Sequence, residues 1–224
     1  MIGTFVNVGT IVAGSLIGGL FRKVMNEELT NSLMNVMGLA AFGLGINAVV
    51  QNMPKSSYPV LFIVSLAAGC LIGTLLKLDE RVERLTKRKD DSGSLGQGIV
   101  TGCLIFCIGT LSILGPVQSA LYGDHTYLFT NASLDFVTAM VLGTTYGVGM
   151  ALAGIILLLW QGAIYLLTLL LGGFITDVMM VEISVVGGFL IAMSGLSIMK
   201  IKDFHTLNCL PALFVPILWC VVRG

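Results

Sequence analysis

A few polar side chains interrupt long apolar stretches of this sequence, and their types suggest cation chemistry. One is a carboxylate and four are amides: Asp135, Asn7, Asn47, Gln118 and Gln161. An ionised side chain in hydrocarbon costs about 2.5 to 3.5 kcal/mol on insertion scales, so an acid found there is a functional candidate by default. We therefore expect Asp135 to bind a coupling cation or proton, with the amides as uncharged ligands for an ion or small polar solute.

Each of these side chains also has a structural interpretation. Asp135 opens an apolar segment after Asn131-Ala132-Ser133-Leu134, so it is equally a first-turn acid stabilised by the helix dipole. The alternative role of each amide is to form a hydrogen bond with a neighbouring helix. Such a bond stabilises helix packing by about 0.6 kcal/mol on average. Three further acids, Asp124, Asp177 and Glu182, fall at predicted segment ends, and we interpret them as hydrated loop residues.

Two glycine-containing stretches predict interruptions of helices. Proline has no N–H group, so at Gly115-Pro116 a helix either ends, leaving Gln118 at the outer interface, or breaks within the membrane. The stretch GTTYGVG, residues 143 to 149, contains Gly143, Gly147 and Gly149. Broken helices form the ion and substrate sites of many transporters, because freed backbone groups line a cavity there.

No enzyme, metal or nucleic-acid motif accompanies these residues. The sequence lacks HExxH, GxSxG, P-loop and paired-carboxylate patterns, so we expect neither enzyme activity nor a cofactor. Its five cysteines lie in apolar runs without metal-ligand spacing, and we interpret them as small hydrophobic residues. Basic and acidic residues number 12 each, so there is no polybasic surface for nucleic acid.

The elements that must position the candidate residues are membrane helices. Of 224 residues 56% are hydrophobic and 11% are charged, and the mean hydropathy is +0.96, whereas soluble domains carry about 25% charged residues. A crossing needs about 20 apolar residues. Candidate segments cover residues 2 to 21, 31 to 50, 57 to 76, 98 to 116, 181 to 199 and 204 to 222. The sequence therefore predicts an all-α, polytopic transmembrane bundle in the lipid bilayer, with one domain over residues 1 to 224.

One apolar run is too long for a single crossing. The 39 residues from Asp135 to Gly173 would extend about 58 Å as one helix, against a hydrocarbon core of about 30 Å. A break within residues 143 to 149 divides the run into two crossings or a re-entrant pair. The predicted total is seven to eight segments.

Basic residues predict the orientation of these segments. Six of them lie in residues 77 to 94: Lys77, Arg81, Arg84, Lys87, Arg88 and Lys89. Because loops rich in Lys and Arg stay in the cytoplasm, residues 77 to 94 and 200 to 203 are expected inside. Both termini and the loops at 51 to 56, 117 to 130 and 174 to 180 are then expected outside.

Glycine patterns add two expectations about packing. The stretches VMGLAAFGLGINAV, residues 36 to 49, and VVGGFLIAMSGLSIM, residues 185 to 199, resemble each other. In the eight-segment arrangement they run in opposite directions, which is either an inverted repeat or a coincidence of composition. Glycines spaced by four residues predict close helix packing, and they also allow a homodimer through a Gly-xxx-Gly face.

Several motifs together resemble the YdfK/YqgA-like bacterial inner-membrane proteins, a domain-of-unknown-function family. They are Phe106-Cys107-Ile108-Gly109, Gly115 with Gln118, Gly123-Asp124, Leu134-Asp135, Gly143 through Gly149, Gln161-Gly162 and Leu210-Pro211-Ala212. The resemblance covers nearly the whole chain. It implies a bacterial plasma-membrane location and a multi-pass helical fold, and it supplies no substrate.

Two functional hypotheses follow. The first is a small secondary transporter or permease for an ion or polar solute, with Asp135 at its site. The second is a non-transporting scaffold or accessory subunit that recruits a partner through residues 77 to 94, whose mixed charges permit i to i+4 pairs on an exposed helix. A polar cavity converging on Asp135 and Gln161 favours transport, and a dry bundle favours the scaffold.

Overall fold

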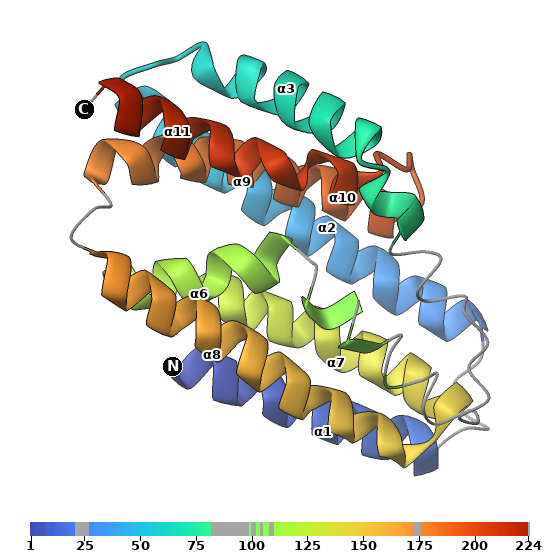
Figure 1. Cartoon of the computed structure of the whole chain (residues 1–224). Coiled ribbons are helices and arrows are strands. Elements are labelled where there is room, and N and C mark those ends of the chain that lie inside the picture. The colour runs from blue at the N-terminus through green and yellow to red at the C-terminus, as the bar shows by residue number, and fades with distance from the viewer. Residues whose placement is uncertain are drawn as a thin grey trace. The chain divides into compact units, whose positions relative to one another are not determined.

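The computed structural model describes residues 1–20, 27–81, 99, 102–103, 105–107, 110–172 and 176–223, and it is helical without strands over these ranges (Figure 1). Its α-helices are α1 (Ile2–Leu20), α2 (Glu27–Asn52), α3 (Leu61–Leu75), α6 (Thr110–Tyr122), α7 (Thr126–Tyr146), α8 (Ala153–Leu171), α9 (Asp177–Ile198), α10 (Thr206–Cys209) and α11 (Phe214–Arg223). Short 3-10 helices are η1 (Met53–Lys55), η2 (Val148–Leu152) and η4 (Leu210–Leu213).

Within the described residues, five helical stretches are long and apolar enough to cross a membrane. They are Ile2–Leu20, Glu27–Lys55, Val148–Leu171, Asp177–Ile198 and Thr206–Arg223, and α3 is a shorter apolar helix. The predicted all-helical class is thus confirmed, and so is the presence of several helices long and apolar enough to span a membrane, whereas the predicted count of seven to eight segments stays a prediction. The charged loop expected at 77 to 94 lies outside the described residues beyond residue 81.

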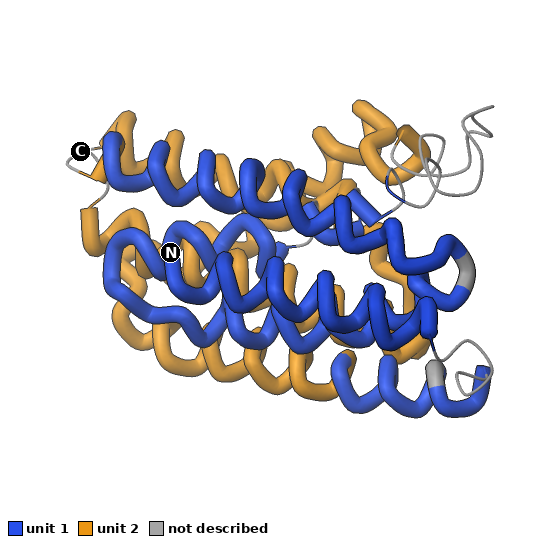
Figure 2. Tube along the Cα trace, turned by 90° about the horizontal axis from the view of Figure 1, so that it is seen from below, with its two compact units in different colours: residues 1–37, 82–170 blue, residues 38–81, 171–224 orange. Residues whose placement is uncertain are grey.

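The chain divides into two compact units, coloured separately in Figure 2. Unit 1 contains Met1–Met37 and Val82–Leu170, and unit 2 contains Gly38–Arg81 and Leu171–Gly224. Each unit therefore combines segments from the beginning of the chain with segments from much later.

In unit 1, α1 and α7 form the most extensive contact between described elements. They run parallel, because Gly3 lies against Leu128 near the start of both helices and Gly18 lies against Met140 nearer their ends. A Cβ atom added at Gly18 would overlap the Met140 backbone, so the helices touch main chain to main chain. Such close approach maximises dispersion contacts, which drive helix association in lipid.

Helix α8 runs antiparallel to α1 in the same unit. Val148 of η2 contacts Gly19 near the end of α1, whereas a Cβ atom added at Gly162 of α8 would lie 3.5 Å from the Met1 side chain. The reversal occurs at Gly147, whose φ of 86° a residue with a side chain rarely adopts. The long apolar run is therefore interrupted between Tyr146 and Val148, inside the predicted stretch.

Two predicted boundaries are wrong. Helix α7 begins at Thr126, so Asp135 is its tenth residue and does not open a helix. Helix α6 continues through Pro116 to Tyr122, so the helix neither ends nor breaks at Gly115-Pro116, and the expected outer loop at 117 to 130 is reduced to residues 123 to 125. Polar residues such as Asn131 and Ser133 suggested a loop, but the helix accommodates them because Ser133 bonds back to the Phe129 carbonyl.

In unit 2, two pairs of helices pack antiparallel. Gly38 of α2 lies against Gly195 of α9, and Gly45 lies against Gly188. Likewise α3 packs along α10 and η4, with Gly69 against Ala212 and Gly73 against Asn208. The glycines at i, i+4 in α3 are therefore occupied by contacts within the chain, as Gly14 and Gly18 are in unit 1.

Polar contacts fix the two ends of unit 2. At one end, the His205 ring contacts Asp79 at 2.7 Å, and the Asn208 side chain accepts a hydrogen bond from the Asp79 backbone N–H. At the other end, Glu182 of α9 accepts hydrogen bonds from Ser56 and from the backbone of Tyr58. Glu182 is only 2% exposed, so its interpretation as a hydrated loop acid is wrong.

A disulfide joins Cys70 of α3 to Cys209 of α10. The interpretation of all five cysteines as simple hydrophobic residues is therefore wrong for this pair. The bond links positions 139 residues apart, on helices that already pack through Gly69 and Gly73. Spacing in sequence carries no signal of such a pairing, because the two cysteines meet only after α3 and α10 have packed.

This disulfide predicts a specific thiol count. If thiols are blocked at cell lysis and the protein is then denatured without reductant, three cysteines should react with the blocking reagent: Cys103, Cys107 and Cys220. After reduction, two more should react with a second reagent, as mass spectrometry can resolve. Five reactive thiols before reduction would contradict the pairing.

Candidate functional site

Asp135 is a buried carboxylate in the middle of α7. Its side chain is 5% exposed, and Oδ2 accepts a hydrogen bond from Asn131 Nδ2 at 2.7 Å, one helical turn earlier. None of the ion pairs found between described residues involves Asp135. Among the described residues, the hydrogen-bond donor to this buried carboxylate is therefore a neutral amide.

Helix α1 contributes two buried polar side chains near its start, Thr4 and Asn7. Thr4, Asn7 and Ile11 recur at helical spacing and are fully buried. Asn7 faces the Asp135 carboxyl across the helix interface. Both polar atoms of Asn7, and Oγ1 of Thr4, nevertheless lie outside hydrogen-bonding geometry with any described residue.

Helix α8 contributes Gln161, which is also fully buried. Its Nε2 donates to Ser112 Oγ of α6 at 3.1 Å, whereas its Oε1 has no hydrogen-bond partner among the described residues. The neighbouring Gly162 lies beside Met1, so Gln161 is at the level of the first turns of α1, where Thr4 and Asn7 are found.

Helix α6 carries the proline at which the sequence predicted an interruption. Pro116 cannot donate a main-chain hydrogen bond, so the Ser112 carbonyl lacks its usual partner four residues later. Ser112 is the residue whose hydroxyl accepts from Gln161. The proline therefore removes one main-chain hydrogen bond from α6, although the helix itself continues.

We define a polar cluster as the buried polar residues Thr4, Asn7, Ser112, Asn131, Asp135 and Gln161, in which Asn7 and Asn131 are partners of Asp135 and Ser112 binds Gln161. All belong to unit 1. The cluster contains a single carboxylate and several neutral oxygens, the ligand types that hard cations and protonated solutes prefer. Buried polar atoms without partners are uncommon in proteins, and each requires an explanation such as water or an ion. No group of three His, Cys, Asp or Glu side chains suited to a transition metal occurs in the described part of the chain.

Comparison with known proteins places the chain in a family. A family model described as "Protein of unknown function (DUF554)" matches residues 2–221. The chain belongs to the DUF554 family. The uncharacterized membrane protein YdfK of Bacillus subtilis (strain 168) is 50% identical over 216 residues, which cover 96% of this chain and 94% of that protein. The uncharacterized protein YqgA of Escherichia coli (strain K12) is 30% identical over 227 residues, again covering 96% and 94%.

No solved structure matches this DUF554 member. The family expected from the sequence motifs is therefore confirmed. A membrane location is supported both by the name of YdfK and by the apolar helices of the structure.

The structure also shows the positions of the other residues that were predicted as ligands or helix breaks in this DUF554 member. Asn47 belongs to unit 2, where it is exposed on α2 and accepts a hydrogen bond from Gln51, and its role as a ligand stays a prediction. Gln118 is half-buried on α6, and its role as a ligand stays a prediction. Gly143 is a packing residue, because a Cβ atom there would lie 2.7 Å from the Ser15 carbonyl, and Gly149 lies in η2.

The sequence did not point to three members of the polar cluster. Asn131 is four residues before Asp135, a spacing that places both on one helix face, but the helix was expected to start later. Thr4 lies three residues before Asn7 and gives the same kind of signal on α1. Ser112 carries no such signal, because its partner Gln161 is 49 residues away.

Proposed function

We propose that this DUF554 member is a secondary transporter or permease for an ion or small polar solute, with Asp135 as the residue that binds the coupling cation or proton. The observation that carries the proposal is a carboxylate 5% exposed among apolar helices, without a basic partner in the described ranges. Ionisable side chains within membrane segments are costly, and they commonly mark ion and proton pathways.

The neutral members of the cluster supply the rest of the site. Asn7 faces the carboxyl, and Gln161 and Thr4 lie at neighbouring levels of α8 and α1 with unsatisfied oxygens. The buried amides of Asn7 and Asn131 beside Asp135 support the transport hypothesis. The scaffold hypothesis rests on residues 77 to 94, of which 82 to 94 lie outside the described residues, so it stays a prediction.

Helix directions within each unit support the eight-segment topology. In unit 1, α1 and α7 run parallel and α8 runs opposite, as expected if segments one, five and six cross inward, inward and outward. In unit 2, residue 79 meets residue 205 at one end, and residues 56 and 58 meet residue 182 at the other. By the positive-inside rule, the end of unit 2 that contains residues 79 and 205 lies on the cytoplasmic side of the inner membrane. Both termini are then outside.

The paired helices of unit 2 also support an inverted repeat. Gly38 and Gly45 on α2 are seven residues apart, as are Gly188 and Gly195 on the antiparallel α9. Each of these helices is followed by a second apolar segment, α3 or α10 to α11, and those two segments pair antiparallel as well. Inverted repeats of this kind underlie alternating access in many transporters.

The topology predicts opposite accessibility for two exposed lysines. In a cysteine-free background, Lys55→Cys should react with a membrane-impermeant thiol reagent in intact cells, because η1 is placed outside. Lys202→Cys should react only after permeabilisation. Labelling of residue 202 from outside would mean that residues 135 to 173 cross the membrane once, and would remove the basis for the inverted repeat.

Binding at the cluster is testable without knowing the transported solute. Purified protein should be stabilised by Na⁺, K⁺ or a small polar solute from a screen, since a ligand at about 100 times its Kd adds about 2.7 kcal/mol. The stabilising ligand should lose its effect on Gln161→Ala and Asp135→Asn. A ligand that stabilises these variants as well as the wild type would place its site elsewhere.

A further inference from the structure

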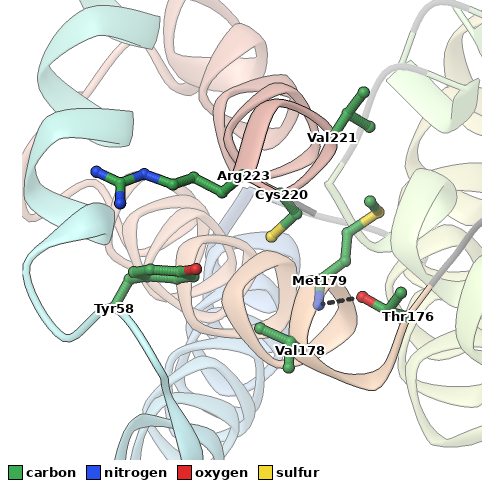
Figure 3. Close-up of a pocket in the computed structure, with 7 residues that line it drawn as sticks. All are labelled: Tyr58, Thr176, Val178, Met179, Cys220, Val221 and Arg223. Carbon is green, nitrogen blue, oxygen red and sulfur yellow. Dashed lines mark hydrogen bonds between the residues drawn. The ribbon is translucent and has the colours of Figure 1, made fainter.

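Unit 2 contains a cavity of about 380 Å³ that lies outside the polar cluster (Figure 3). Its walls come from the loop before α3, the start of α9 and the end of α11. The lining residues are Tyr58, Thr176, Val178, Met179, Cys220, Val221 and Arg223. In the close-up, the Tyr58 hydroxyl and the Cys220 sulfur point toward the middle of this group, and the Arg223 side chain extends above the Tyr58 ring.

Among the described residues that line the cavity, one is charged, and it is basic. The Arg223 guanidinium lies 5.0 Å from the centre of the Trp219 ring, and Tyr58 meets the same ring edge-on at 5.9 Å. No described carboxylate forms an ion pair with Arg223. The cation–π contact orients the guanidinium and leaves its N–H donors available to an anion.

Hydrogen bonds to Glu182 fix the loop that carries Tyr58, which forms one wall of the cavity. Glu182, 2% exposed, accepts hydrogen bonds through Oε1 from Ser56 Oγ at 2.7 Å and from the Tyr58 backbone N–H at 3.1 Å. On the opposite wall, Thr176 caps α9 by accepting a hydrogen bond from the Met179 N–H. The cavity is therefore bounded by segments that the fold itself fixes, and a ligand would bind without ordering them first.

The rest of the lining is mostly apolar. Val178, Met179 and Val221 offer hydrocarbon surface, while the Tyr58 and Thr176 hydroxyls are the neutral polar groups. A site of this composition fits a ligand with one anionic end and an apolar body. The Trp219 and Tyr58 rings beside Arg223 are also the residue types that gather where a membrane helix meets the headgroup layer.

We propose that this cavity binds an amphiphile that carries one anionic group, a phosphate diester or a carboxylate, on an apolar chain. The anion pairs with Arg223, and the chain packs against Val178, Met179 and Val221. This chemistry is found in anionic phospholipids of the membrane and in free fatty carboxylates. The site is separate from the polar cluster, so the proposal stands or falls independently of transport through Asp135.

The test uses Trp219 as a reporter, because it contacts both Arg223 and Tyr58. In purified full-length Trp160→Phe protein in a non-ionic detergent, Trp219 is the remaining tryptophan. Titration with dihexanoyl-phosphatidylglycerol or with octanoate should change its fluorescence saturably. Dihexanoyl-phosphatidylcholine, which has a compensating positive charge, should bind at least tenfold more weakly. The tighter of the two anionic ligands identifies the source.

Variants separate the proposed site from general charge attraction. Arg223→Gln should weaken anion binding about tenfold or more, as expected when a charged hydrogen-bond donor is lost, and Arg223→Lys should retain most of it. Lys55→Gln removes the same charge from an exposed position in the same unit and should change the affinity less than twofold. Equal binding of phosphatidylcholine, unchanged binding by Arg223→Gln, or no saturable response to either anion would overturn the proposal.

Discussion

Asp135→Asn is expected to abolish cation flux through the reconstituted protein. Asparagine keeps the size of the side chain and its ability to hydrogen-bond Asn131, but it can neither carry a negative charge nor take up a proton. If the carboxylate is the cation ligand, flux of protons, Na⁺ or K⁺ into proteoliposomes should fall from the wild-type value to that of protein-free liposomes. Pyranine fluorescence reports the proton arm, and ²²Na⁺ and ⁸⁶Rb⁺ uptake report the alkali-cation arms.

The same variant should fold at least as well as the wild type. Removing an ionisable group from an apolar bundle removes a desolvation cost, so the midpoint of thermal unfolding should not decrease. Asp177→Asn is the matched control, because Asp177 is exposed in the first turn of α9, in unit 2. It should leave the flux unchanged. Wild-type flux in well-folded Asp135→Asn protein would refute the role given to this residue.

Gly18→Val is expected to cause a large loss of stability. The new side chain would overlap the Met140 carbonyl, and backbone cannot move aside as a flexible side chain can. Separating α1 from α7 would expose Asn7 and Asp135 at the centre of the site. Overpacking usually costs about 1 to 3 kcal/mol, and we expect about 3 kcal/mol or more at this position because the obstacle is main chain.

Gly9→Val provides an internal control on the same helix. Gly9 is exposed, and a Cβ atom there would meet nothing within 4 Å. Both variants replace glycine by the same β-branched residue, so they share any effect on helix propensity. Thermal unfolding in detergent should show a large decrease for Gly18→Val and little change for Gly9→Val. Similar midpoints for the two variants would contradict the close α1–α7 packing.

Hydropathy was sufficient to predict the fold class, because lipid selects for apolar helices whatever their partners are. Helix ends were less predictable. Asp135 resembled a helix start because Asn131 and Ser133 are typical of caps and loops, yet α7 begins nine residues before Asp135. In the packed bundle, the Asn131 amide donates a hydrogen bond to the Asp135 carboxylate. Asn131 is therefore a polar residue of the candidate site and does not indicate a loop.

The candidate site was predictable in its central residue and not in its composition. A lone acid in an apolar run is conspicuous, so the sequence alone made Asp135 a candidate. Its neighbours depend on which helices meet: Thr4 and Asn7 join it through α1, but Asn47, the same residue type in a similar run, lies in unit 2. The Cys70–Cys209 disulfide and buried Glu182 depend on tertiary contacts in the same way.

Infrared difference spectroscopy of the reconstituted protein tests the central claim most directly, because it observes the carboxyl group itself. Spectra should be recorded for a pH step and, at constant pH, for replacement of choline by Na⁺ or K⁺. We predict a carboxyl or carboxylate band that responds to one of these steps in the wild type and in Asp177→Asn, and that is missing in Asp135→Asn. A spectrum that is the same with and without the Asp135 carboxyl under every step would show that this residue binds no cation.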